Sequence, residues 1–460
     1  MSLSEHARLY STAAIAVAFA AGILVTLGFK DVYPDLERNY QQNRKQARGH
    51  HSHAPARRSS LFFGPVELED RDSPAVEAAK PLGSLHHLPP PAAAGIEATI
   101  GNTPLVQIRS LSAATGRVIL AKAELLNGAG GSPKDRVALH VLRDAEARGL
   151  LDPARRGDTV YEGTVGSTGI SLATLARARG YRAHICMPDD QSAEKAELLL
   201  RLGATVERVP VAPIASPDHF VNLARRRAAQ HAARHADGTH GFFADQFENP
   251  ANWAAHAAST GPEIWTQTGG RLAAFVAGAG TGGTIAGVAK YLKEERRATD
   301  VRIVLADPQG SGLYNRVRHG VMYSATEREG TRRRQQVDTV VEGVGINRIT
   351  ANFEAGRELV DDAVRVTDEQ AMRMARWLVE NDGIFIGSSS AVNCVAAVVT
   401  ALSLPEGSEV VTVLCDSGTR HLSKFWKRVA EDGLEHNEEG PKRVVDPPDL
   451  LQYLGLDLHK

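Results

Sequence analysis

Short apolar runs alternate with amphipathic stretches through most of the chain from residue 96 onward. Each run has the length of a strand and is rich in Val, Ile, Leu and Ala, as in strands buried on both faces. Helical periodicity fills the intervals, as at residues 170–179 and 193–202. This alternation predicts an α/β fold with parallel sheets covered on both faces by helices. The predicted strands are residues 118–123, 159–162, 182–187, 205–209, 272–277, 301–306 and 410–415.

Two of these strands are followed by loops rich in glycine and threonine, each leading into a helix. Backbone N–H groups at such a junction form a ready site for an anion. Residues 280–284, Gly-Thr-Gly-Gly-Thr, have the glycine density of a phosphate cup. They lack the Lys-Ser/Thr pair of a Walker loop and the spacing of a dinucleotide fingerprint, and such a loop alone is as often a tight turn. Residues 163–169 offer hydroxyls and amides that suit a carboxylate.

A glycine run at residues 128–131 precedes Ser132, Pro133 and Lys134. Ser132 can cap a helix that starts here, and Pro133 suits its first position. Lys134 then lies in the first turn, where the positive end of the helix dipole lowers an amine's pKa, as a Schiff-base lysine requires. The alternative is an ordinary solvated lysine. A third polar cluster, residues 387–390, follows an apolar run and has a helix cap as its alternative.

The amino-terminal segment differs in composition from the rest. Residues 12–29 are uncharged and nearly all apolar, about the length of the shortest bilayer-spanning helices. A cleaved signal peptide is the alternative, but the basic start is weak and no clean cleavage pattern follows. We therefore expect a membrane anchor at residues 1–30, with the basic flank after it keeping the rest of the chain in the cytosol. Residues 31–95 mix charge, His, Ser and Pro without a period, which predicts a disordered linker.

Composition excludes some classes of function. With 53 Lys and Arg against 54 Asp and Glu, the net charge of −1 gives no basic field for nucleic acid. The 3 cysteines are far apart, so we expect buried thiols in a reducing compartment and no disulfide framework. The 17 histidines show no metal-ligand spacing, and no metal site is expected.

Several short motifs occur in the order and spacing of one known family. They are Ile-Gly-Asn-Thr-Pro-Leu at 100–105, Ser-Pro-Lys-Asp-Arg at 132–136, Gln-Phe-Glu-Asn-Pro-Ala-Asn at 246–252, Thr-Gly-Pro-Glu-Ile-Trp at 260–265, Asp-Ser-Gly at 416–418 and the two loops above. Each motif is modest alone, but their order and spacing together are highly specific. From about residue 96 to residue 424 the chain resembles the cysteine synthase family of fold-type II pyridoxal-phosphate (PLP) enzymes.

The resemblance implies two α/β domains with parallel or mixed sheets and PLP in the cleft between them. The expected amino-terminal transmembrane helix precedes these domains and lies outside the resemblance. The catalytic domain would span residues 96–430, with a smaller mobile subdomain at about 135–245 and a tail at 431–460. Lys134 would be the catalytic residue, as Schiff-base lysine and general base. The other implied cofactor-binding residues are Ser167, Gly280, Thr281, Gly282, Gly283, Thr284 and Ser389. The implied substrate-binding residues are Thr164, Val165, Gly166, Thr168 and Gln246.

Two stretches depart from the family pattern. The family usually reads Thr-Ser-Gly-Asn-Thr where residues 164–168 read Thr-Val-Gly-Ser-Thr. Val165 removes a hydroxyl near the substrate, and Ser167 replaces an asparagine that contacts the cofactor's ring oxygen. Around Ser389 the chain reads Gly-Ser-Ser-Ser-Ala where Gly-Ile-Ser-Ser-Gly is commoner. These changes leave the PLP prediction intact and bear on the amino-acid substrate and the level of activity.

The activity implied by the resemblance is a β-replacement that forms L-cysteine from O-acetyl-L-serine and sulfide through an aminoacrylate intermediate. Within the class, the alternatives are a serine-using cystathionine-type synthase and a serine/threonine dehydratase. From another class, the alternative is a non-catalytic, membrane-tethered binding protein, although the intact Lys134 and phosphate cup argue against it. A homodimer is expected by resemblance. The Ala-rich anchor and its basic flank favour the lipid bilayer of the mitochondrial outer membrane.

Overall fold

A computed structural model describes residues 92–191, 193–233, 238–323, 339–434 and 447–456. The chain separates into two units, Met1–Pro89 and Pro90–Lys460, and all of the described structure belongs to the second. The predicted anchor at residues 12–29 and nearly all of the predicted linker lie outside the described residues. In the part of the chain that is described, no helix combines the length and apolarity needed to cross a bilayer.

The larger of two sheets has six strands in the order β1-β2-β10-β7-β8-β9. All neighbouring strands are parallel except β1, which pairs antiparallel with β2. The predicted parallel sheet is therefore mixed at one edge. Its strands are β1 (Leu105–Gln107), β2 (Val118–Ala123), β7 (Leu272–Gly278), β8 (Arg302–Pro308), β9 (Asp362–Val366) and β10 (Glu409–Leu414).

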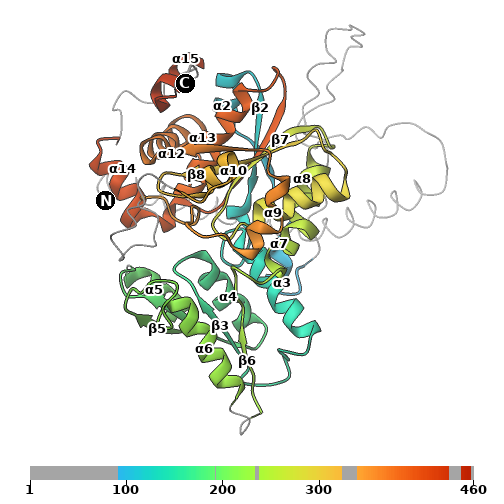
Figure 1. The fold of residues 1–460 in the computed structure, drawn as a ribbon, viewed down its shortest axis with the longest axis vertical. Coiled ribbons are helices and arrows are strands. Elements are labelled where there is room, and N and C mark those ends of the chain that lie inside the picture. The colour runs from blue at the N-terminus through green and yellow to red at the C-terminus, as the bar shows by residue number, and fades with distance from the viewer. Residues whose placement is uncertain (1–91, 192, 234–237, 324–338, 435–446, 457–460) are drawn as a thin grey trace, which may run out of the picture. The chain divides into compact units, whose positions relative to one another are not determined.

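Helices cover both faces of this sheet, because its central strands are apolar on both sides. In β10, Val410 and Leu414 pack into one core cluster, whereas Val411 and Val413 pack into another. Figure 1 shows α12 and α13 on one side of the sheet and α8 and α9 on the other. The helices of the first cluster are α2 (Arg109–Thr115), α12 (Asp368–Asp382), α13 (Ser388–Leu402), α14 (Lys427–Glu431) and α15 (Pro447–Leu454). Those of the second are α8 (Gly261–Gln267), α9 (Gly283–Ala289), α10 (Leu313–His319) and α11 (Ala351–Glu354).

The smaller sheet has four parallel strands in the order β5-β4-β3-β6. They are β3 (Thr159–Gly163), β4 (Arg182–Pro188), β5 (Thr205–Val209) and β6 (Gly241–Phe243). Helices α3 and α4 share a core with β3 and β4, while α6 contributes to a separate cluster with Cys186 and Val209. The helices around this sheet are α3 (Lys134–Ala147), α4 (Ser167–Ala178), α5 (Ala193–Arg201), α6 (Phe220–Ala232) and α7 (Ala251–Ala255).

Two helices begin at other residues than predicted, and the predicted tail contains a helix. The helix predicted at 170–179 begins at Ser167, so the second half of the predicted loop forms the first helical turn. Pro133 is the N-cap of α3 and not its first residue, although the Ser132 hydroxyl still accepts a hydrogen bond from the Lys134 amide at 3.3 Å. The predicted tail at 431–460 includes α15, which buries Leu450 and Leu454 against the larger core.

Candidate active site

A cavity of about 480 Å³ lies where several parallel strands end. Its lining includes the last residues of β3, β4 and β7 and the residues that follow β10. The carboxyl ends of parallel strands are where open α/β sheets place ligands. Both sheets contribute to the wall, so the cavity belongs to neither sheet alone.

Lys134 enters this cavity from the first turn of α3. Burial lowers the pKa of its ammonium, while the nearby Cys415 and Asp416 act in the opposite direction. Among the described residues, no ion pair or hydrogen bond of its ε-amine is found. Lys122 differs, because its ammonium is tied to Glu263 at 2.6 Å and to the Thr103 carbonyl at 2.6 Å. Of these two lysines, Lys134 is the one with an amine available for covalent chemistry.

The two residues after Lys134 fix the start of α3. The Asp135 carboxylate accepts hydrogen bonds from the Gly130 amide at 2.7 and 2.8 Å and from the Ser171 hydroxyl at 2.6 Å. The Arg136 guanidinium forms two hydrogen bonds with Glu124, both at 2.8 Å, and two with Glu263 at 2.6 and 2.8 Å. These buried contacts hold the first turn of the helix, and therefore Lys134, in one place.

The predicted phosphate cup follows β7 and leads into α9. A Cβ on Gly280 would lie 2.3 Å from the Gly343 carbonyl oxygen, and a Cβ on Gly283 would lie 1.9 Å from Asn252 Oδ1. Gly282 has a φ of 84°, in the left-handed region that favours glycine. Within the described structure, the amides of residues 281–284 have no hydrogen-bond acceptor. A close backbone, free N–H groups and two threonine hydroxyls suit a phosphate group.

The structure places four of the five predicted cup residues on the cavity wall. Gly280, Thr281, Gly282 and Thr284 line the cavity, whereas Gly283 packs against Asn252 and does not. The role of Gly283 is therefore to let the cup approach the helix behind it.

The loop after β3 also lies on the wall, with all of its predicted substrate-binding residues. The Thr168 hydroxyl donates to Gln246 Oε1 at 2.5 Å, and Gln246 Nε2 donates to Glu162 Oε1 at 3.2 Å. Burial raises the pKa of Glu162 to about 8. The Ser167 hydroxyl lies 3.4 Å from Oδ2 of Asp416, a residue that follows β10 of the larger sheet. The residues of this set on the wall are Thr164, Val165, Gly166, Ser167, Thr168 and Gln246.

The three serines at the start of α13 have different surroundings. Ser388 accepts a hydrogen bond from the Glu342 amide at 2.9 Å, and Ser390 accepts one from the Cys415 amide at 2.8 Å. Ser389 lines the cavity and its hydroxyl contacts the Cys415 thiol. Only Ser389 among the three therefore offers its side chain to a ligand, which fits a partner for a pyridine nitrogen.

Sequence reasoning missed several residues of this site. Cys415, expected to be a buried thiol, is half-buried and lines the cavity. Glu342 and Lys195 line it as well, from segments that carry no motif. Asp416 belongs to the quoted Asp-Ser-Gly motif, which was the available signal for it, and it accepts a hydrogen bond from His421 Nε2 at 3.1 Å.

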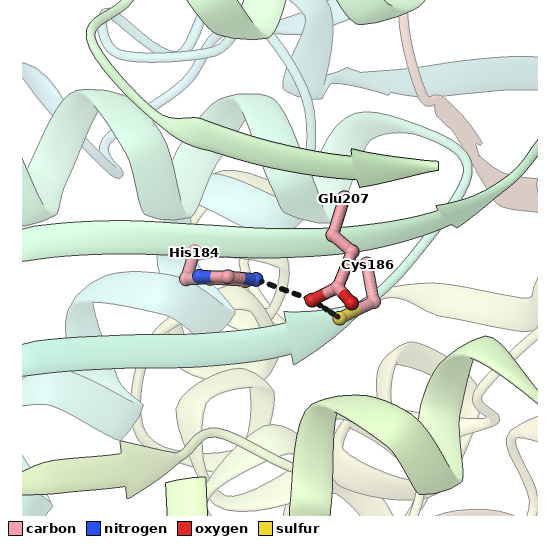
Figure 2. A group of neighbouring side chains, drawn as sticks. All are labelled: His184, Cys186 and Glu207. Carbon is pink, nitrogen blue, oxygen red and sulfur yellow. Dashed lines mark hydrogen bonds and ion pairs between the residues drawn. The ribbon is translucent and has the colours of Figure 1, made fainter. Parts of the chain in front are cut away.

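One cluster of potential metal ligands lies apart from the cavity residues, on β4 and β5. Figure 2 shows His184 and Cys186 directed toward the carboxylate of Glu207, at 3.0 and 3.9 Å. Both carboxylate oxygens also accept hydrogen bonds from Arg227, at 2.6 and 3.1 Å. Burial raises the pKa of the Cys186 thiol to about 12. The arginine thus balances the carboxylate, and the cluster is satisfied as a salt-bridged group.

Comparisons with known proteins agree with this geometry. The family described as pyridoxal-phosphate dependent enzyme matches residues 96–416. Cysteine synthase 2 of Neurospora crassa is 67% identical over 99% of this chain and 99% of its own length. Cysteine synthase 2 of Emericella nidulans is 58% identical over 94% of this chain and 96% of its own length.

Solved structures give the same family. The O-acetylserine-dependent cystathionine beta-synthase from Helicobacter pylori has a TM-score of 0.60 at 31% identity, over 73% of this chain and 98% of its own. O-ureido-L-serine synthase has a TM-score of 0.63 at 32% identity, over 76% of this chain and 98% of its own. The chain therefore belongs to the pyridoxal-phosphate dependent enzymes and, among them, to the cysteine synthase family, with pyridoxal 5'-phosphate as its cofactor.

Proposed function

We propose that this protein is a cysteine synthase that makes L-cysteine from O-acetyl-L-serine and sulfide by β-replacement. The observation that carries the proposal is a half-buried Lys134 amine, with no partner among the residues that the structure describes, in the same cavity as the phosphate cup and the loop after β3. The sequence relatives named cysteine synthase 2 support the same activity.

The residues present fit PLP. The cup of Gly280, Thr281, Gly282 and Thr284 would hold its phosphate, Ser389 would meet its ring nitrogen, and Lys134 would bind it covalently. When bound, PLP supplies an electron sink for negative charge at the substrate's α-carbon. A neutral serine at the ring nitrogen favours elimination over transamination, because it leaves that nitrogen unprotonated.

The chain's own groups then position substrate and move protons. Thr164, Thr168 and the loop amides would bind the amino-acid carboxylate, and Gln246 would hold Thr168 in place. The Lys134 amine would accept the α-proton and return it after sulfide has added. Its lowered pKa serves this role, since an amine must be neutral to accept a proton.

A second candidate, a cystathionine-type synthase, is favoured by one observation. Lys195, Lys424 and Glu342 bring charges of both signs to the cavity wall, where an amino-acid thiol would present a carboxylate and an ammonium. Cystathionine beta-synthase of Mus musculus is 38% identical to this chain over 75% of it.

One experiment separates these candidates. Purified full-length protein loaded with PLP is given O-acetyl-L-serine with sulfide, L-serine with homocysteine, or L-serine alone, and the products are measured. We expect L-cysteine from the first mixture and no product from Lys134→Ala. Cystathionine as the main product would favour the second candidate, and pyruvate from serine alone would favour a dehydratase. A protein that forms none of these while binding PLP would favour the non-catalytic alternative.

We also propose that residues 12–29 anchor the enzyme in the mitochondrial outer membrane, with the catalytic unit in the cytosol and acting as a homodimer. The apolar run and its basic flank support the anchor. A Saccharomyces cerevisiae relative, 57% identical over 75% of this chain, has a provisional name as a mitochondrial cysteine synthase. Carbonate extraction should leave the full-length protein with membranes, and protease added to intact mitochondria should remove its catalytic unit. Release by carbonate would refute the anchor, and protection from protease would refute the orientation.

A further inference from the structure

Arg348 is a fixed cation on the cavity wall, close to the loop after β3. Its guanidinium lies 4.7 Å from the centre of the Phe247 ring and donates a hydrogen bond to Glu248 Oε1 at 2.6 Å. Phe247 follows Gln246, which accepts a hydrogen bond from the Thr168 hydroxyl of that loop. The aromatic ring and the carboxylate therefore hold the guanidinium beside the loop that would bind the amino-acid substrate.

Most of the hydrogen-bond donors of Arg348 remain available to a ligand. A guanidinium presents its N–H groups in a planar fork that matches a carboxylate. The contact with Glu248 uses Nη1, and within the described structure no acceptor is found for Nε or Nη2. The side chain is 30% exposed, so a molecule in the cavity can reach these groups.

His219 adds a neutral donor to the wall of the same cavity. Its Nδ1 accepts a hydrogen bond from the Val221 amide at 3.2 Å, at the start of α6, so Nδ1 carries no proton. Burial and the nearby charge of Arg348 lower the pKa of His219 to about 4. The neutral ring then carries its proton on Nε2, and no acceptor for this N–H is found among the described residues.

The backbone places His219 beside the same loop. A Cβ on Gly163, at the end of β3, would lie 2.4 Å from the Val221 Cα and 2.8 Å from the Phe220 carbonyl oxygen. The start of α6 is therefore packed directly against the start of the loop. His219 and Arg348 consequently both border the place where the amino acid would bind.

The proposed reaction creates an anion at this place. The α-proton of O-acetyl-L-serine passes to the Lys134 amine, the Cβ–O bond breaks, and the bonding electron pair leaves with acetate. Thr164, Thr168 and the loop amides would be occupied by the carboxylate of the amino acid, so the acetyl group needs donors of its own. A cation and an N–H group placed where negative charge develops lower the barrier to its departure.

We propose that Arg348 and His219 form a leaving-group subsite: the guanidinium and the imidazole Nε2–H bind the acyl oxygen of O-acetyl-L-serine and then the carboxylate that departs. This inference rests on the proposed synthase activity. The subsite would favour O-acylated serines over free serine, because the hydroxide that free serine must lose has no second oxygen for the arginine fork.

Acetate release in a single turnover tests the role of Arg348. Holoenzyme is mixed with O-acetyl-L-serine without sulfide, and acetate is measured after rapid quenching. Arg348→Met should slow the release about tenfold, the effect of one hydrogen bond to a charged group, and Arg348→Lys should regain part of the rate through its charge. Arg365→Met is the matched control, because Arg365 lies 4.3 Å from the centre of the Tyr314 ring and does not line the cavity. Equal slowing in Arg365→Met would contradict the subsite.

A different leaving group gives a second comparison. Chloride, which leaves from β-chloro-L-alanine, is a weaker base than acetate and has no pair of oxygens for the arginine fork. Arg348→Met should therefore slow chloride release less than acetate release, and it should leave the later addition of sulfide unchanged. Equal slowing with both substrates would overturn the subsite.

The contribution of His219 must be separated from its role as the cap of α6. Asparagine can still accept the Val221 amide, but its shorter side chain withdraws the donor from the cavity. His219→Asn should keep the melting temperature and slow acetate release about threefold. An unchanged rate of release would overturn the assignment of His219.

Binding of acetate gives a readout that needs no turnover. Titration of holoenzyme with ¹³C-labelled acetate should show by NMR a site that is lost in Arg348→Met and kept in Arg365→Met. Binding that survives Arg348→Met would overturn the subsite alone. A holoenzyme that releases no acetate from O-acetyl-L-serine would instead overturn the proposed synthase activity.

Discussion

The ammonium of Lys195 lies 3.0 Å from the carboxylate of Glu342, and both residues line the cavity. Lys195 belongs to α5 beside the smaller sheet. Glu342 lies on the segment before α11 and is held by a hydrogen bond from its amide to Ser388. The pair therefore links a helix beside the smaller sheet to a segment that packs on the larger sheet, and opening the cavity at this point would break it.

Removing this ion pair should weaken substrate binding. Lys195→Met is expected to lower kcat/KM for O-acetyl-L-serine about fivefold, corresponding to about 1 kcal/mol for a partly buried pair whose side chains are 27% and 24% exposed. Arg201→Gln is the matched control, because it breaks an exposed pair with Glu197 on the same helix, with side chains 79% and 63% exposed. Steady-state kinetics at low and high salt would check this, since the loss should shrink at high salt. Equal effects of the two variants would contradict a role for the cavity pair.

Lys134 and Lys122 give a second prediction, because both are lysines with lowered pKa values and only one is ion-paired. Borohydride treatment of the holoenzyme should fix the cofactor on the peptide that contains Lys134, as mass spectrometry would show. Lys134→Ala should lose the label together with activity. Lys122→Met should keep the label and lose stability, because Glu263 and Glu124 would lose a buried counter-charge. Label on Lys122, or on any other lysine, would refute the assignment.

Glu162 predicts a pH dependence of stability. Its pKa in the folded protein is raised from 4.5 to about 8 by burial, so the fold favours the neutral carboxyl. The stabilisation of the fold by the neutral Glu162 carboxyl is fully present below pH 4.5, and it is lost as the pH rises through 8. Between those values wild type should lose roughly 1.4 kcal/mol of unfolding free energy per pH unit relative to Glu162→Gln. Urea unfolding from pH 5 to pH 9 measures this difference.

Asp307 provides the comparison for Glu162. Burial raises the pKa of Asp307 to about 7. Wild type should therefore lose unfolding free energy relative to Asp307→Asn in the same way, but this loss should end nearer pH 7. A constant difference between wild type and Glu162→Gln across the range would show that Glu162 is ionised in the fold.

The elements that the sequence predicted well are those with a strong local signal. Strands such as β7 and β10 are apolar on both faces, and glycine runs mark the turns beside Lys134 and Gly280. Strands β1, β6 and β9 were missed for local reasons. The first two have three residues each, and β9 carries Asp362 and Arg365 at an edge of the sheet.

Other features depend on contacts that no local pattern contains. The start of α4 was placed too late because glycines and small polar residues mask a helical turn. Lys195 and Glu342, whose side chains meet at the cavity, are 147 positions apart along the chain. Their roles follow from the packing of helices on the sheets.

Ser167 and Val165 carry the last prediction. The Ser167 hydroxyl lies 3.4 Å from Asp416 Oδ2, which is beyond the usual range for an O–H···O hydrogen bond. Replacing Ser167 therefore removes only a weak contact of its hydroxyl with the rest of the protein. Val165 is half-buried and lines the cavity, so a hydroxyl at this position would face the ligand site.

Restoring the residues of the family pattern should raise turnover. Ser167→Asn with Val165→Ser is expected to increase kcat/KM on O-acetyl-L-serine about threefold to tenfold, because the hydrogen bonds that the two changes restore are together worth about 0.5–1.5 kcal/mol. The single variants separate the two contributions, and the PLP absorption band shows whether Ser167→Asn also changes how the cofactor is held. If the double variant abolishes activity, the loop is adapted to a different amino acid. The serine-using synthase and the dehydratase would then explain Val165 and Ser167 better than cysteine synthesis from O-acetyl-L-serine.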